Sequence, residues 1–510
     1  MARLLGVDIG TSGTKTVLFD EYGTTLASAT AEYSLYQPHI GWAEQDPEDW
    51  WRATAQTIAQ VLQKCGTRGD EVTGVGLSGQ MHGMVLLGAD NEVLRPAIIW
   101  CDQRTQKQCD DITEIIGRER LIQITANPAI TGFTASKIMW VKQNQPEIYD
   151  KIRKILLPKD YIRFRLTGEF ATEVSDASGM QLLDVPNRCW SREVLEKLEI
   201  PYEWMADVYE SQEISARVDA RGAKETGLAV GVPVAGGGGD QAAGAVGNGI
   251  VRQGIVSATI GSSGVVFAHT DKLAIDPKGR VHTFCHAVPG AWHIMGVTQG
   301  AGISLKWLRD EFLGEEREIA KSLGVDPYEL MNKEAALARP GCDGLLFLPY
   351  MMGERTPHLD ASAKGVFFGL TAMHKRRDMI RAVMEGVSYS LLDCMNIIRE
   401  LGGDADVVRA SGGGARSVLW RQMICDMFRS DVATIQSAEG PALGVALLAG
   451  VGTGVYGSVP EACETVIKQN PVQKPDEAAA KVYETFYPVY RALYPALKDC
   501  YAQTAQILAE

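Results

Sequence analysis

Residues 232–249 of the sequence are VPVAGGGGDQAAGAVGNG. The first four form an apolar run that predicts a buried strand, and Asp240 stands between four glycines and a small-residue segment that can form a helix. Glycine adopts positive φ without steric cost and lets a ligand approach the backbone closely. A carboxylate at this position either caps the helix or acts as a general base facing a ligand, and the stretch alone leaves both interpretations open.

The length and composition indicate a globular protein of more than one domain. The 510 residues exceed what one ordinary core accommodates, and hydrophobic residues make up a normal 45%. The 53 glycines gather in short clusters, which indicates tight turns rather than a low-complexity tract. A formal net charge of −13 argues against nucleic acid as a partner, because such binding needs basic surface.

The sequence predicts a cytoplasmic protein with no membrane partner. No stretch approaches the ~18 consecutive apolar residues that a membrane span needs. Asp8 interrupts the N-terminal segment where a secretory signal would be apolar. The ten cysteines include no CxxC pair, and we expect them to be reduced thiols.

Two similar glycine turns lie about half the chain apart. Residues 4–20, LLGVDIGTSGTKTVLFD, predict a strand carrying Asp8, a turn and a second strand. IGTSG at 9–13 is matched by IGSSG at 260–264, an offset of 251 residues that indicates an internal duplication. Such turns point backbone N–H groups outward and can bind anions, with Thr11, Ser12 and Lys15 as further donors. Either turn taken alone is also compatible with an ordinary hairpin.

A polar turn, SGQMHG at 78–83, follows the strand predicted at 72–77. The C-terminal ends of strands are the usual ligand-binding edge of an α/β sheet. His82 is either a buried histidine with satisfied hydrogen bonds or a partner for a sugar hydroxyl, and the turn by itself favours the buried histidine. In WCDQR at 100–104, Trp100 offers an apolar face beside polar groups.

Glycines mark two further turns in the second half of the chain. GAGISLKW at 300–307 predicts a helix that begins at glycine, where phosphate can meet backbone N–H groups. VVRASGGGARSVLW at 407–420 predicts a strand, a triple-glycine turn and a helix. The backbone at Gly413 and Gly414 could lie flat under a planar base or simply connect the strand to the helix.

Together, these motifs resemble the FGGY carbohydrate kinases. GFTASKIMW at 132–140 is similar to one family signature, and GVFFGL with DMIRAVMEG, within 365–386, is similar to the other. The resemblance implies an α/β protein with a two-domain, actin-like ATPase (ribonuclease H-like) fold and a catalytic cleft between the domains. Residues 1–246 would form the sugar-binding domain and residues 247–510 the nucleotide-binding domain.

The resemblance also implies roles for individual residues. Asp240 matches the family's catalytic base, and Asp8 matches the acid that places magnesium near the phosphates. The expected sugar contacts are Met81, His82, Trp100, Asp240 and Gln241. The expected nucleotide contacts are Thr11, Ser12, Lys15, Gly261, Ser262, Gly302, Lys306, Gly413 and Gly414.

For the activity, the resemblance implies phosphorylation of a sugar, with ATP and Mg²⁺ required. SGQMHG, WCDQR and GERTPH (353–358) are similar to family members that convert D-xylulose to D-xylulose 5-phosphate. Gln241 stands where many of those members have asparagine. Ribulose, gluconate and glycerol therefore stay open as substrates, as does a nucleotide-driven binding protein without kinase activity. A homodimer is one assembly that the sequence leaves open.

Overall fold

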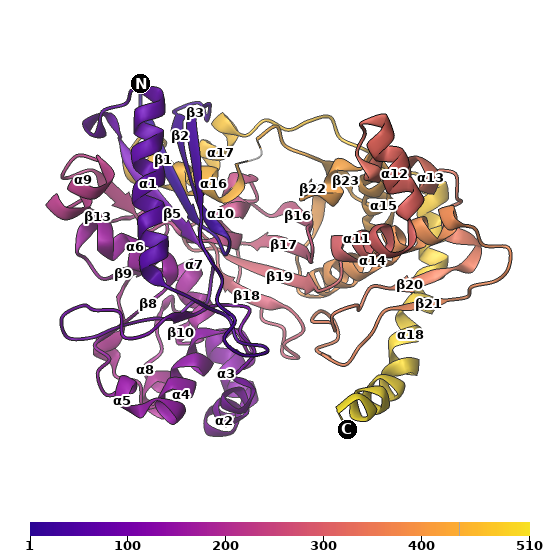
Figure 1. The fold of residues 1–510 in the computed structure, drawn as a ribbon, viewed down its shortest axis with the longest axis horizontal. Coiled ribbons are helices and arrows are strands. Elements are labelled where there is room, and N and C mark those ends of the chain that lie inside the picture. The colour runs from indigo at the N-terminus through magenta and orange to yellow at the C-terminus, as the bar shows by residue number, and fades with distance from the viewer. Residues whose placement is uncertain (438, 510) are drawn as a thin grey trace.

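The computed structural model describes residues 1–437 and 439–509 and contains two α/β halves side by side (Figure 1). The first half is built on a mixed sheet of seven strands and the second on a mixed sheet of six. Helices pack on both sheets, and each half has its own large apolar core. The predicted two-part α/β architecture is confirmed.

The first sheet has the strand order β13-β14-β5-β1-β2-β3, and β15 also pairs with β5. β1 runs antiparallel to β2 and parallel to β5. The strands are β1 (Arg3–Ile9), β2 (Gly13–Asp20), β3 (Thr25–Glu32), β5 (Gly74–Gly79), β13 (Ile214–Arg217), β14 (Pro233–Ala235) and β15 (Gly238–Gly239).

The second sheet repeats this arrangement in the order β18-β19-β17-β16-β22-β23. β16 runs antiparallel to β17 and parallel to β22, as β1 does to β2 and β5. The shared topology supports the internal duplication predicted from the two glycine turns. The strands are β16 (Gly254–Ile260), β17 (Gly264–Thr270), β18 (His282–Cys285), β19 (Trp292–Thr298), β22 (Ala405–Ser411) and β23 (Asp431–Ala433).

Short strands pair outside the two large sheets. These pairs are β4 (Glu44–Gln45) with β7 (Ala97–Ile98), β6 (Val85–Leu87) with β8 (Lys154–Leu156), β9 (Ala171–Glu173) with β12 (Asp207–Tyr209), β10 (Leu183–Asp184) with β11 (Cys189–Trp190), and β20 (Leu346–Leu348) with β21 (Val366–Phe368).

The helices alternate with the strands along the chain. Those up to the middle of the sequence are α1 (Pro47–Cys65), α2 (Gln106–Ile116), α3 (Arg118–Thr125), α4 (Thr134–Asn144), α5 (Pro146–Tyr149), α6 (Pro158–Thr167), α7 (Val174–Ala177), α8 (Arg192–Lys197), α9 (Ala220–Thr226) and α10 (Asp240–Gly247). The remainder are α11 (Gly302–Phe312), α12 (Gly314–Leu323), α13 (Pro327–Ala335), α14 (Arg376–Glu400), α15 (Val418–Phe428), α16 (Gly440–Gly452), α17 (Val459–Val466) and α18 (Glu477–Ala509). Across the described residues, none of these helices combines the length and apolar character needed to cross a bilayer.

Helix α1 shows how local sequence sets an element. The side chain of Asp46 caps the helix by accepting a hydrogen bond from the backbone N–H of Glu48 at 2.9 Å, and Pro47 occupies the first turn. Gly66 ends the helix in the left-handed conformation at φ 62°. The apolar face in between, which includes the fully buried Ile58, packs against the first sheet.

Helix α16 joins the two halves, because it lies late in the sequence but packs on the first sheet beside α10 (Figure 1). Glycines in the strands permit this close approach. A Cβ at Gly6 of β1 would lie 1.9 Å from the carbonyl oxygen of Ala442, and one at Gly76 of β5 would lie 1.9 Å from that of Val445. The division of the chain into domains at residues 246 and 247 stays a prediction.

Replacing Gly6 by alanine is expected to destabilise the protein, because the new methyl group would collide with the backbone of α16. We expect the free energy of unfolding to fall by about 1–3 kcal/mol, the usual cost of overpacking. Gly314 begins α12 and has open space at its Cβ position, so Gly314→Ala is the matched control with little expected change. Urea unfolding followed by tryptophan fluorescence measures both variants, and equal stability of the two would contradict the packing argument.

Candidate active site

The predicted catalytic and sugar-binding residues gather at the carboxyl ends of three neighbouring parallel strands. β5 lies between β1 and β15, and Ser78 of β5 is the register partner of both Asp8 and Gly238. Asp240 follows Gly238 by two residues, and His82 follows the end of β5. Because carboxyl ends of parallel strands share one edge, the sheet brings Asp8, His82 and Asp240 to the edge where α/β proteins bind ligands.

Asp240 is the first residue of α10 and does not cap it. The cap position belongs to Gly239, and no side-chain capping hydrogen bond is present at this end of the helix. Loss of hydration, followed by the negative charge of Asp8, raises the pKa of the half-buried Asp240 carboxyl to about 7, and hydrogen bonds from Gln241 oppose the rise. The alternative that Asp240 serves only as a helix cap is therefore wrong. A carboxylate with a pKa near neutrality is suited to accept a proton from a bound hydroxyl.

Asp8 has an unused oxygen that fits a magnesium ion. Burial raises the pKa of its carboxyl, while Ser78 and Lys15 lower it. Oδ1 is buried and has no hydrogen-bond partner among the described residues. In the same part of the chain, no cluster of three or more His, Cys, Asp or Glu side chains could hold a metal by itself. Magnesium is typically bound by one or two carboxylates together with waters and substrate phosphates, which this single carboxylate fits.

His82 presents a neutral imidazole with a free acceptor nitrogen. Its Nδ1 lies 2.8 Å from the carbonyl oxygen of Gly179, so Nδ1 must carry the hydrogen and Nε2 must be the acceptor. Burial lowers the pKa of His82 to about 3, which keeps the ring uncharged at neutral pH. The ring stacks on Phe133 with centroids 4.4 Å apart. Nε2 makes no hydrogen bond to any described residue, so only one of the two nitrogens is satisfied within the protein.

Lys137 of α4 supports the His82 turn and was not assigned from the sequence. His82 adopts a positive φ of 67°, and its carbonyl oxygen accepts hydrogen bonds from the Lys137 ammonium at 2.8 Å and from the Thr134 hydroxyl at 3.0 Å. The lysine is fully buried, and loss of hydration lowers its pKa to about 7. The position of Lys137 inside the GFTASKIMW motif could have pointed to a functional role. Nothing in the motif predicts that its ammonium bonds to the His82 carbonyl oxygen.

The other predicted sugar contacts, Met81, Gln241 and Trp100, lie near the glycine turn before Asp240 or near the first glycine hairpin. Met81 is buried against the glycine turn, and a Cβ at Gly239 would lie 2.9 Å from its Cγ. Gln241 follows Asp240 on α10 and is half buried. Trp100 is 45% exposed, and its indole N–H donates to the hydroxyl of Thr11 at 2.9 Å. Trp100 therefore borders the first glycine hairpin.

The first hairpin holds Thr11, Ser12 and Lys15 close together. The Gly10 N–H donates to the carbonyl oxygen of Gly13 at 3.0 Å, which closes the turn between β1 and β2. The ammonium of Lys15 lies 2.6 Å from the carboxylate of Glu439, next to α16. The charge of Lys15 is thus shared with a residue from the second half of the sequence.

A cavity of about 580 Å³ opens in the second half, within the size range of small-molecule sites. It is formed by the second hairpin, the start of α11 and the triple-glycine turn. The predicted nucleotide contacts that line it are Gly261, Ser262, Gly302, Lys306, Gly413 and Gly414. Tyr328 and Asn332 of α13 also line it and were missed, because an ordinary amphipathic helix carries no glycine signal. Thr11, Ser12 and Lys15 are outside the lining.

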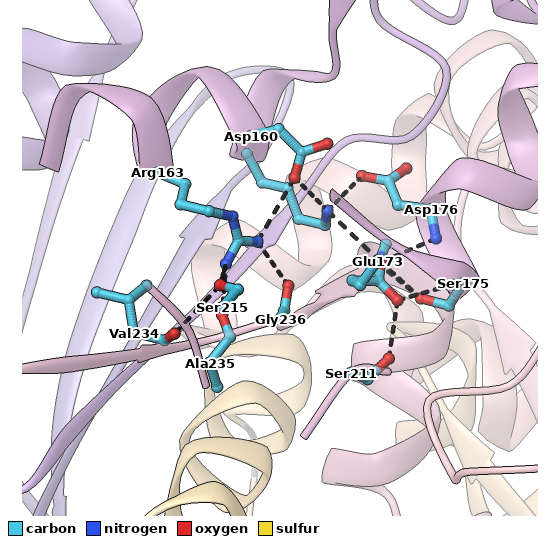
Figure 2. Close-up of polar contacts among 12 residues, drawn as sticks. Asp160, Arg163, Glu173, Ser175, Asp176, Ser211, Ser215, Val234, Ala235 and Gly236 are labelled. Carbon is cyan, nitrogen blue, oxygen red and sulfur yellow. Dashed lines mark hydrogen bonds and ion pairs between the residues drawn. The ribbon is translucent and has the colours of Figure 1, made fainter. Parts of the chain in front are cut away.

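A buried polar network holds the glycine turn from behind (Figure 2). Arg163 of α6 donates to the carbonyl oxygens of Ala235 and Gly236, each at 2.6 Å. On the other side, the hydroxyl oxygen of Ser175 accepts a hydrogen bond from the backbone N–H of Gly239 at 3.2 Å. These contacts fix the backbone on both sides of the turn that leads to Asp240.

The same network contains more acids than bases. The Lys159 ammonium lies 2.7 Å from Asp160, 3.5 Å from Glu173 and 3.3 Å from Asp176, and all four side chains are buried. Burial raises the pKa of Asp176 well above its usual value, and the nearby carboxylates reinforce the rise against Lys159. Breaking such a set by removing one cation leaves buried charge and carbonyl groups without partners.

Replacing Arg163 by methionine is expected to destabilise the protein strongly, because two buried carbonyl oxygens and Asp160 lose a donor. The expected loss of unfolding free energy is about 3–5 kcal/mol. Arg217 is exposed and donates to the carbonyl oxygen of Gly231, so Arg217→Met provides a control in which the guanidinium contacts solvent. Thermal and urea unfolding compare the two, and a stable Arg163→Met protein would rule out this support for the turn.

The chain is similar to known carbohydrate kinases over nearly its whole length. Residues 3–247 match the N-terminal domain, and residues 256–453 the C-terminal domain, of the FGGY family of carbohydrate kinases. A xylulose kinase of Escherichia coli (strain K12) is 40% identical, covering 97% of this chain and 99% of its own length. A gluconokinase of Bacillus subtilis (strain 168) is 34% identical, covering 98% of this chain and 97% of its own.

Solved structures agree with this assignment. The crystal structure of a xyloylose kinase from Brucella ovis superposes with a TM-score of 0.90 at 36% identity, covering 98% of this chain and 100% of that chain. The predicted actin-like, two-domain α/β fold is thereby confirmed. This chain belongs to the FGGY family of carbohydrate kinases.

Proposed function

We propose that the protein transfers the γ-phosphoryl group of ATP to D-xylulose and forms D-xylulose 5-phosphate. The observation that carries this proposal is Asp240, a half-buried carboxylate with a pKa of about 7 on the sheet edge shared with Asp8 and His82. Support for D-xylulose as the sugar comes from the Escherichia coli xylulose kinase, which is similar over nearly the whole of both chains.

Asp240 acts as the general base in this proposal. Its carboxylate accepts the proton of the C5 hydroxyl while that oxygen forms a bond to the γ-phosphorus. The bond between the γ-phosphorus and the bridging oxygen breaks, and its electron pair leaves with ADP. Because the transition state of phosphoryl transfer is loose, the protein contributes mainly by positioning groups and stabilising charge.

His82 orients the sugar and does not exchange protons at neutral pH. With its hydrogen on Nδ1 held by Gly179, Nε2 accepts a hydrogen bond from a sugar hydroxyl. The ring stays neutral because its pKa is about 3. Met81, Trp100 and Gln241 complete the proposed sugar site, and the contact of Lys137 with the His82 carbonyl keeps the strained turn in place.

The nucleotide occupies the cavity of the second half. Gly261, Ser262 and Gly302 border the phosphates, and the backbone N–H of Ser262 is the donor, because the N–H groups of Gly261 and Gly302 already bond to the carbonyl oxygens of Ser263 and Gly261. Gly413, Gly414 and Lys306 border the base and ribose. The first hairpin, with Thr11, Ser12 and Lys15, faces the terminal phosphates in this arrangement.

Mg²⁺ is the cation we propose, and Asp8 is the residue that would hold it. When bound, the ion neutralises negative charge on the phosphate oxygens. We also propose that the protein works in the cytoplasm, and that the sugar and nucleotide sites belong to domains divided at residues 246 and 247.

A substrate panel tests the proposed function. ADP release, coupled to NADH oxidation, is measured with D-xylulose, D-ribulose, D-gluconate and glycerol. We expect the highest kcat/KM with D-xylulose. A higher value with D-gluconate would transfer the substrate assignment to the activity of the 34% identical gluconokinase. ATP binding without ADP release on any sugar would favour the binding-protein alternative.

Asp240→Asn is the matched variant for the panel, because it removes the proton acceptor and keeps the side-chain shape. We expect kcat to fall by about 10²–10⁴-fold, while binding of a fluorescent ATP analogue is retained. Turnover close to that of the unaltered protein would refute the role of Asp240 as the base.

The activity should depend on pH through Asp240. The base must be deprotonated to act, and its pKa is raised to about 7, so kcat/KM for the sugar should fall as the pH drops through 7 and level off above about pH 8. His82, with a pKa of about 3, contributes nothing in this range. Lys137, with a pKa of about 7, also titrates here, but loss of its charge would weaken the support of the His82 turn as the pH rises, which is opposite in sign to the effect of Asp240. Nucleotide affinity measured over the same pH range separates this effect from ATP protonation. A kcat/KM for the sugar that stays constant between pH 6 and 8 would contradict the assignment of Asp240 as the titrating base.

A further inference from the structure

Arg355 lies in the loop after β20, and both of its neighbours are fastened to the end of β19. The carboxylate of Glu354 accepts hydrogen bonds from the Thr298 hydroxyl at 2.7 Å and from the backbone N–H of Arg355 at 2.7 Å. Thr356 donates its N–H to the carbonyl oxygen of Val297 at 3.0 Å, and its hydroxyl accepts the N–H of Val297 at 3.1 Å. The backbone that carries Arg355 is therefore held in one position.

The middle of β19, two residues before Val297, lies next to the proposed sugar-binding residues. β19 pairs with β18, where Met295 is the register partner of His282. The His282 ring lies 5.8 Å from Phe133, and Phe133 stacks on His82. Figure 1 shows β18 and β19 extending from the second sheet toward the first half. A chain of direct contacts thus connects the strand that anchors Arg355 with the proposed sugar-binding histidine.

The guanidinium of Arg355 has no hydrogen-bond or ion-pair partner among the described residues, although burial lowers its pKa. Its positive charge also lowers the pKa of both His82 and His282, which agrees with a location beside these two rings. Arg163, which is fully buried, instead donates to two carbonyl oxygens. The Arg355 side chain is half-buried, so its N–H donors stay available, and a ligand rich in oxygen atoms would supply acceptors for them.

We propose that Arg355 is a sugar-binding residue that reaches the substrate from the nucleotide-binding half. The hydrogen-bonding chemistry of the two groups is complementary, since a guanidinium only donates hydrogen bonds while Nε2 of His82 only accepts them. A sugar hydroxyl can donate to His82 and accept from Arg355 at the same time, and a keto oxygen can accept from Arg355. This inference rests on the proposed function as a sugar kinase but not on the identity of the sugar.

The consequence is a link between the halves that only a bound sugar completes. His82 belongs to the first half and Arg355 to the second, so a sugar held by both joins the sugar site to the part that carries the nucleotide cavity. Such a contact favours phosphoryl transfer to the sugar over transfer to water, because closure around substrate excludes solvent.

The test compares Arg355→Gln with the unaltered protein. Hydrogen bonds to charged groups contribute about 1.5–3 kcal/mol, so we expect the sugar KM to rise about 10- to 100-fold while the KM for ATP changes less than about twofold. In Arg355→Ala, added guanidinium chloride should restore part of the lost kcat/KM, which a purely structural role would not allow. Thermal unfolding and binding of the fluorescent ATP analogue establish that both variants are folded.

Arg416→Gln is the matched control, because Arg416 lines the nucleotide cavity and should show the opposite pattern, with a raised KM for ATP only. The assays use whichever panel sugar the unaltered protein phosphorylates best. Failure of D-xylulose in the panel therefore overturns the proposed substrate without affecting the Arg355 test. A sugar KM within about twofold of the unaltered value in folded Arg355→Gln, with no guanidinium rescue of Arg355→Ala, would overturn the Arg355 assignment.

Discussion

The parallel pairing of β5 with β1 on one side and with β15 on the other is the constraint on which the site depends. It sets Asp8, Ser78 and Gly238 in one row across the sheet, so that Asp240 and His82 emerge beside Asp8. Gly237 makes the β15 contact possible: it has a φ of 74°, and a Cβ there would lie 2.0 Å from the carbonyl oxygen of Leu77. A side chain at this position would push β15 away from β5 and displace the base.

The strand register also determines the electrostatics of the site, because it places the carboxylates of Asp8 and Asp240 close together in a region of low hydration. The proximity of Asp8 adds to burial in raising the pKa of Asp240. Behind the turn, Arg163 and Lys159 bind carbonyl and carboxylate oxygens and hold the backbone still. The site thus combines a rear held by buried hydrogen bonds and ion pairs with a front where Oδ1 of Asp8 has no partner among the described residues.

Local patterns in the sequence predicted the glycine turns well, because the physical reason for each turn lies within a few residues. The hairpin at 9–13, its counterpart at 260–264 and the turn before Asp240 all form where glycine clusters follow apolar runs. The sequence left open whether Asp240 caps the helix or acts as a general base, since the capping role depends on which residue begins the helix. A one-residue difference in the start of α10 decides it.

Contacts between distant segments escaped prediction for a different reason. The packing of α16 on β1, the pairing of Lys15 with Glu439 and the bond from Lys137 to the His82 carbonyl join residues 55 to over 400 positions apart. No local periodicity encodes such pairs. The glycines at positions 6 and 76 were weak sequence evidence for close packing of another element, but a glycine in a strand equally indicates a bulge or a bend.

In the proposed role of Asp240 as the base, the burial that raises its pKa would also limit the fraction of molecules in which its carboxylate is ready to accept a proton. A stronger proton acceptor needs a higher pKa, and a pKa equal to the ambient pH leaves half of the carboxylates protonated. At a pKa of about 7, the site lies near the balance between these two demands in neutral solution. Phosphate groups entering the cleft would raise the pKa further, whereas a cation at Asp8 would lower it again. In the proposed mechanism, the unpartnered oxygen of Asp8 would therefore do more than hold the ion, because the charge of a bound cation would keep Asp240 deprotonated when the substrates are bound.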